Sequence, residues 1–204
     1  MARNSWQLTA VALAAGLGFT QPIAQAADPN PTIAIRVDDP NGSVTASLPR
    51  AKSIASDIYS QAGVTLQWTI DDTTTANRTL TVIITTSVKA PAGLAIDAMG
   101  VAPSPGDGTR GTTAYVFRDR VTAFAESNRL AAWSVLACAL AHEIGHLLLP
   151  PNAHAAVGIM RGSWHAALFP PKAPGVPGFP PEQARLLRLR ARSRDNSNLE
   201  RNPN

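Results

Sequence analysis

Residues 130–160 read LAAWSVLACALAHEIGHLLLPPNAHAAVGIM and hold three of the four histidines of the 204-residue chain. The part up to residue 148 is rich in Ala and Leu and contains no proline, which favours a helix. Pro150 and Pro151 then end that helix, because proline lacks the amide hydrogen that a continuing helix needs. The sequence therefore predicts a long apolar helix that is followed directly by a turn.

The motif H-E-x-x-H lies inside this helix, at His142, Glu143 and His146. Residues four apart lie on one face of a helix, so both imidazoles can bind one Zn²⁺ ion with bonds of about 2.0–2.1 Å. Zinc lowers the pKa of a bound water to about 7, and the neighbouring carboxylate of Glu143 can take a proton from that water. The motif thus predicts a hydrolytic zinc site. The alternative is a helix with two solvated or core histidines.

A catalytic zinc site usually has three protein ligands and one open position. No Asp or Glu occurs from residue 147 to residue 181, so a nearby third ligand has to be His154 or His165. His154 follows the helix-ending prolines, where the chain turns back, and we favour it. His165 is expected at the surface or in packing. Glu182 is a distant alternative, although its place in the first turn of a helix already explains a negative charge there.

H-E-x-x-H, a third histidine and the tripeptide GIM at 158–160 resemble the metzincin clan of zinc endopeptidases. The resemblance implies three zinc ligands, a general base and a methionine in a tight turn beneath the metal: His142, His146, His154, Glu143 and Met160. The segments RAKSIASDIYSQAGVTLQW and AYVFRDRV are also similar to those of uncharacterised exported bacterial proteins with the same centre. Without that family pattern, Met160 could equally be a core methionine.

The chain departs from the pattern H-E-x-x-H-x-x-G-x-x-H of the clan. Leu149 stands where the glycine belongs, Asn152 stands where the last histidine belongs, and His154 comes two residues later. Because the differences all lie after His146, the departure concerns the identity of the third ligand more than that of the first two. The resemblance also implies that an edge strand just before the active-site helix binds substrate as an added antiparallel strand. The segment expected in that role, or else in the sheet core, is Ala114, Tyr115, Val116 and Phe117.

Alternating apolar residues and turn signals place the other elements. Strands are predicted at 32–37, 64–70, 79–87 and 113–118, and helices at 50–62, 130–148 and 181–192. Residues 90–112 are rich in Gly and Pro and are predicted to form a long loop. The order of these elements predicts an α+β domain with a mixed, mainly twisted sheet packed on helices. By resemblance, it would be a metzincin-like domain with an active-site helix and a Met-turn.

The ends of the chain differ from its body. Residues 1–27 hold a short apolar run before Ala24-Gln25-Ala26-Ala27, which predicts a cleaved signal peptide, no stable membrane anchor and a secreted or periplasmic protein. Residues 28–169 are then the metallopeptidase-like domain, and residues 170–204 are a proline-rich spacer with a basic C-terminal helix. The single cysteine, Cys138, excludes an internal disulfide framework and is expected to be buried.

Charge is uneven along the chain. Residues 28–181 hold 11 Lys and Arg against 11 Asp and Glu, whereas residues 182–204 hold 6 against 3. The neutral body predicts no nucleic-acid partner. A peptide or protein substrate is what the resemblance to the zinc endopeptidases implies. The rival hypothesis is a non-catalytic, zinc-containing binding protein that meets its partner through Arg185, Arg188 and Arg192. The plainer interpretation of that helix is a cap in which Leu186 and Leu189 pack inward.

Overall fold

The computed structural model describes residues 29–70, 79–89, 93–105, 110–151, 153–166, 169 and 177–199. The predicted signal peptide at 1–27 lies outside the described residues. So do the predicted turn at 71–77, parts of the loop 90–112 and residues 170–176 of the spacer. Within the described part of the chain, no helix has the length and apolar character needed to cross a membrane.

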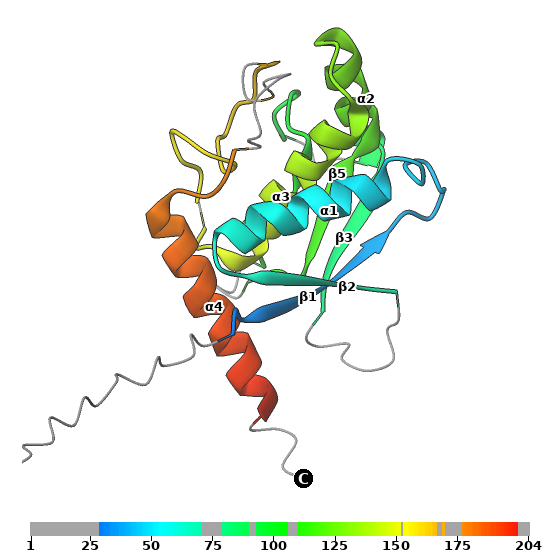
Figure 1. Ribbon diagram of the computed structural model, residues 1–204. Helices are drawn as coiled ribbons and strands as arrows, with labels where there is room; N and C mark the ends of the chain where they lie inside the picture. The colour runs from blue at the N-terminus through cyan, green and yellow to red at the C-terminus, as the bar shows by residue number, and fades with distance from the viewer. Residues whose placement is uncertain are drawn as a thin grey trace, which may run out of the picture.

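One layer of the molecule is a five-stranded mixed sheet with the strand order β2-β1-β3-β5-β4 (Figure 1). Neighbouring strands are parallel except for β4, which runs antiparallel to β5. The strands are β1 Thr32–Asp38, β2 Thr65–Thr69, β3 Leu80–Thr85, β4 Gly100–Val101 and β5 Thr113–Phe117. Four of them match predicted strands, with ends shifted by at most two residues.

Helices form the second layer and confirm the α+β class. They are α1 Leu48–Gln61, α2 Arg118–Ser127, α3 Ala132–Leu148 and α4 Pro181–Leu199, with a short 3₁₀ turn η1 at Ser87–Lys89. Helices α1 and α3 pack on each other and on one face of the sheet. Side chains alternate accordingly in β3, where Leu80, Val82 and Ile84 are buried while the residues between them are half-buried. Helix α2 was not predicted.

The centre of the core is helix α3, whose side chains are buried all round from Val135 to Gly145. A helix that is apolar on every side is typical of an element surrounded by others. Here α1, α2, α4, β3 and β5 all contact it. Helix α1 also contributes a buried tyrosine, Tyr59, whose hydroxyl donates a hydrogen bond of 3.0 Å to the carbonyl of Ala141. The residue that precedes the first histidine of the motif is therefore tied to the core.

The prediction of an edge strand at Ala114, Tyr115, Val116 and Phe117 is wrong. Strand β3 pairs with one side of β5 and β4 pairs with the other, so this segment lies inside the sheet. The outer strand is β4, which falls within the predicted loop 90–112. Two residues are too short to show an alternating pattern, and only the pairing with β5 makes them a strand.

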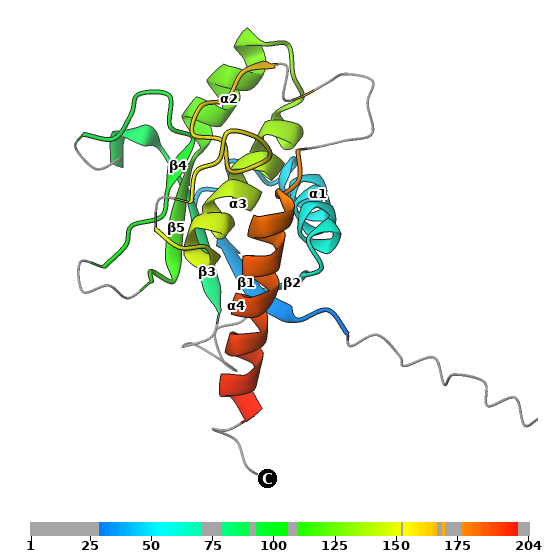
Figure 2. The ribbon, with the colours of Figure 1, turned by 90° about the vertical axis from the view of Figure 1, so that its left-hand side faces the viewer.

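The C-terminal helix α4 packs against β1 and α3 (Figure 2) and continues to residue 199 instead of ending at 192. Leu187 and Ala191 are fully buried in the common core. The prediction that Leu189 packs inward is wrong, because this side chain is 52% exposed, whereas Leu186 is partly buried as predicted. The helix thus acts as a cap on the core, with Leu187 as its main anchor.

Cys138 is buried in α3, as predicted, and burial raises the pKa of its thiol from an ordinary 9.0 to about 12. The thiolate is the reactive form, so the native protein should not react with a disulfide reagent at pH 8. The unfolded chain should react and release one equivalent of the reagent's thiol per chain. Because only the unfolded thiol ionises between pH 9 and about 12, it also lowers the free energy of unfolding over that range. Cys138→Ala is the zero-label control, and rapid labelling of the native protein would contradict the burial.

Candidate metal centre

Helix α3 carries the first part of the site. His142 and Glu143 are buried, and His146 is half-buried one turn further along. The helix ends at the residue before Leu149, whose amide donates a hydrogen bond of 2.8 Å to the carbonyl of Gly145. The two prolines that follow then turn the chain back toward the helix, as predicted.

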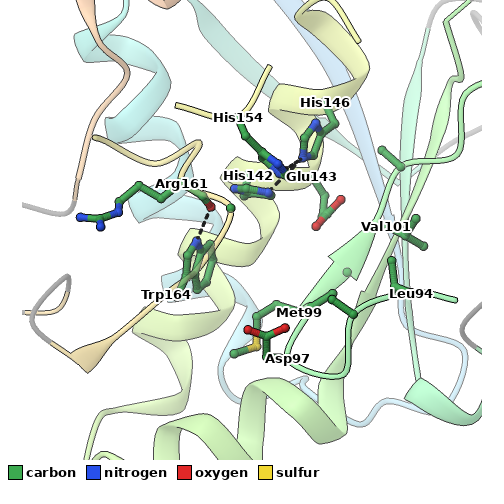
Figure 3. Close-up of a pocket in the computed structure, with 15 residues that line it drawn as sticks. Leu94, Asp97, Met99, Val101, His142, Glu143, His146, His154, Arg161 and Trp164 are labelled. Carbon is green, nitrogen blue, oxygen red and sulfur yellow. Dashed lines mark hydrogen bonds between the residues drawn. The ribbon is translucent and has the colours of Figure 1, made fainter. Parts of the chain in front are cut away.

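The turn brings His154 to the two histidines of the motif. Nε2 of His146 lies 3.0 Å from Nε2 of His142 and 3.1 Å from Nε2 of His154. All three donor atoms lie within 4.8 Å of one another, and Figure 3 shows the three rings converging. Four ligands at about 2.05 Å around a tetrahedral zinc ion would be roughly 3.3 Å apart. The spacing of the three imidazoles therefore fits a single metal ion. The rings are too close together for a larger group to bind between them.

A backbone carbonyl fixes the orientation of the first ring. Nδ1 of His142 lies 2.9 Å from the carbonyl oxygen of Ile159. A carbonyl oxygen only accepts hydrogen bonds, so Nδ1 carries the proton and Nε2 keeps the lone pair that a metal needs. Ligating histidines commonly have such a partner, which holds both the tautomer and the ring.

Burial also keeps these rings in the neutral, metal-binding form. Together with the smaller effect of the neighbouring histidines, it lowers the pKa of His142 to about 4 and that of His146 to about 3. The hydrogen bond from His142 to Ile159 opposes the shift without reversing it. Because a metal competes with protons for imidazole nitrogens, rings that resist protonation favour metal binding at neutral pH.

Met160 lies directly beneath the motif. The residue is fully buried. Its backbone carbonyl accepts a hydrogen bond of 2.8 Å from the amide of Ala155. A Cβ atom added at Gly145 would lie 2.5 Å from the sulfur of Met160. Only glycine therefore allows the methionine to approach the helix between the two histidines of the motif.

The carboxylate of Glu143 is held between α3 and the edge strand. Its side chain is 3% exposed, and Oε2 is buried without a hydrogen-bond partner among the described residues. Burial raises the pKa of this carboxyl to about 8. A Cβ atom at Gly100 of β4 would lie 2.8 Å from Cγ and Cδ of Glu143, so glycine is needed for this close approach. A buried acid that lacks a partner is typical of a group that acts on a ligand.

Two pockets flank the three rings. The first, of about 300 Å³, lies between the loop that leads into β4 and residues 161–164 (Figure 3). Leu94 and Met99 line one side of it, and Trp164 lines the other, with its ring 5.6 Å from that of His142. The second, of about 230 Å³, lies at the C-terminal end of α3. The residues that line both pockets are Ala102, His146 and His154.

Arg120 of α2 holds the loop that forms one wall of the first pocket. Its Nη1 atom donates hydrogen bonds to the carbonyls of Ala95 (2.9 Å) and Ala98 (2.8 Å). The guanidinium also lies 5.1 Å from the centre of the Phe117 ring, within reach of a cation–π contact. Because Met99 and its neighbours line the pocket, α2 fixes the position of this wall.

Other residues named from the sequence lie outside the group. His165 is exposed and does not join the three rings. Glu182 is exposed on α4 and forms a salt bridge of 2.8 Å with Arg185. The segment 114–117 lines neither pocket. Gly100, Trp164 and Arg120 were missed, because they lie in an unpredicted two-residue strand, a loop and an unpredicted helix, and no periodic pattern marks them.

Comparisons with known proteins leave the class of this protein open. No model of a known family matches the chain, and a search of the curated proteins also finds no match. The function therefore has to be inferred from the residues of the site themselves.

Proposed function

We propose that the protein is an exported zinc-dependent metallopeptidase of metzincin-like design, which hydrolyses internal peptide bonds. The observation that carries the proposal is the convergence of His142, His146 and His154 beside a buried, unpartnered Glu143. Met160 beneath the helix and an antiparallel edge strand beside the pocket support the metzincin-like part. Zinc is the ion that three imidazoles and one open position suit best.

Glu143 is the residue that moves the proton in this proposal. When bound, zinc supplies Lewis acidity toward the scissile carbonyl and toward water. The carboxylate of Glu143 accepts a proton from the attacking water and delivers it to the nitrogen of the leaving amine. Burial favours the protonated form that Glu143 takes between the two transfers, whereas the positive charge of a bound metal would favour the ionised form that accepts the first proton.

The edge strand and the two pockets explain why an internal bond would be cleaved. A peptide can pair with the free side of β4 as a further strand, and main-chain hydrogen bonds then hold it across the histidines. All three rings line the first pocket and two of them also line the second, so the substrate has room for side chains before and after the scissile bond. A site for terminal residues alone would need only one pocket.

The rival function, partner binding through the basic helix, has less support. Of the three arginines predicted to meet the partner, Arg188 donates a hydrogen bond of 2.8 Å to the carbonyl of Ala62 in the core. Arg185 is paired with Glu182, which leaves only Arg192 for a partner. The buried face of α4 already belongs to the domain core.

A chelator experiment separates the two functions. The chain without residues 1–27 is incubated with casein and with a peptide library, with and without a zinc chelator. We expect cleavage that stops on chelation and returns when zinc is added, because the three histidines supply the only described ligand group of this kind. Zinc-independent cleavage, or no cleavage by folded and zinc-loaded protein, would favour the binding protein.

A further inference from the structure

The second pocket has a basic wall that the proposed reaction does not use. Arg110 lines this pocket, together with prolines and leucines at the end of α3. Its Nε atom donates a hydrogen bond of 3.1 Å to the carbonyl of Leu149, which holds the half-buried side chain in place. Among the described residues, neither terminal amino group has a hydrogen-bond partner and no acidic side chain pairs with this guanidinium.

A second arginine stands close to the first. The positive charge of Arg110, added to burial, lowers the pKa of Arg190 on α4. The Nε atom of Arg190 is buried and has no hydrogen-bond partner within the described chain. No acidic side chain in the described part of the chain pairs with either guanidinium, so the two charges repel each other, and a carboxylate placed at the pocket would lessen that repulsion.

The order of the edge segment gives the direction of a bound peptide; this step rests on the proposed function. Residues 94–95 and 97–101 line the first pocket, Ala102 lines both, and residues 103–104 line the second. A peptide added antiparallel to β4 runs in the opposite direction, from the second pocket to the first. Its residues on the N-terminal side of the scissile bond therefore lie at Arg110, and the residue after that bond faces Trp164.

We propose that Arg110 selects substrates with an acidic side chain on the N-terminal side of the cleaved bond. Guanidinium and carboxylate match in geometry, and the pair can form two parallel hydrogen bonds. Because the Arg110 side chain is partly exposed, its ion pair with the substrate should contribute only roughly 1 kcal/mol to binding. This corresponds to a preference of about fivefold to tenfold for an acidic over a basic residue.

The test uses zinc-loaded protein and three peptides that differ at one position, with Glu, Gln or Lys two residues before the cleaved bond. We expect the order Glu, Gln, Lys in kcat/KM, and an order that reverses with Arg110→Glu while the Gln peptide changes little. Loss of a merely structural contact would lower all three rates together. Arg110→Lys should keep the wild-type order, and Arg192→Glu, an exposed reversal on α4, should leave it unchanged. Equal rates for the Glu and Lys peptides in the wild type would overturn the inference and leave the proposed function standing.

Binding separates the two proposals if nothing is cleaved. Fluorescence anisotropy of the labelled peptides should give tighter binding for Glu than for Lys, with the order reversed in Arg110→Glu. That result with no cleavage would reject the peptidase and retain the acid-selective pocket. Equal or absent binding of all three peptides would overturn the pocket. If Arg110→Glu fails to fold, Arg190→Glu reverses the neighbouring charge without touching Leu149 and should reduce the Glu preference.

Discussion

Glu143→Gln should lower kcat/KM for peptide hydrolysis by about 10²–10⁴-fold, the usual contribution of a general acid–base group. Glutamine fills the same space beside Gly100 but cannot accept and return a proton. The three histidines are unchanged, so zinc content should stay at the wild-type value. The measurement is steady-state hydrolysis of a cleaved peptide, together with the metal content of the same sample by mass spectrometry.

Glu182→Gln is the matched control for that experiment. It makes the same chemical change at an exposed carboxylate on α4, outside both pockets. We expect full activity and an unchanged fold. Wild-type hydrolysis by the Glu143 variant with zinc bound would remove the proton-transfer role, whereas loss of zinc in that variant would mean that the carboxylate serves the metal directly.

His154→Ala should weaken zinc binding by roughly 10²–10³-fold. Four-ligand zinc sites bind with about 10–16 kcal/mol, so a single ligand accounts for about 2.5–4 kcal/mol. Loss of that free energy raises the Kd for zinc by roughly 10²–10³-fold. His154 is exposed, and its removal should therefore cost the core little. Competition with a zinc-sensitive dye gives the affinity, and hydrolysis at saturating zinc shows whether activity returns.

His165→Ala is the natural control, because it removes the same side chain from an exposed position eleven residues further along. Its zinc affinity should equal that of the wild type. An unchanged affinity in His154→Ala would show that two histidines and some other group hold the metal. A loss of affinity in the His165 variant would assign the third ligand to the residue that the structure leaves outside the cluster.

Short-range patterns account for what the sequence predicts well. The spacing of His142 and His146 on a helix depends only on helical geometry, and the prolines that end this helix act within two residues. The choice of His154 needs one further step, the absence of acidic residues downstream, and the structure places it with the other two. The strand predicted at 64–70 is likewise marked by its own alternation, and the structure forms β2 at Thr65–Thr69.

Long-range pairing accounts for what was missed. Strand β4 has two residues and exists because β5 lies beside it, so its local sequence resembles a loop. Gly100 matters because of Glu143, and Arg110 because of a carbonyl at the end of α3. In α4, the choice between Leu187 and Leu189 depends on where the helix meets β1, which helical periodicity alone does not set.

The hydrogen bond from His142 to the Ile159 carbonyl sets the first ring before any ion arrives. If the proposed function holds, a metal-free molecule should therefore need little rearrangement to take up zinc. Such a chain could fold first and bind zinc afterwards, even where the ion is dilute. Under the proposed function, a sample stripped of zinc by a chelator should remain folded, lose its activity and regain it when zinc is added.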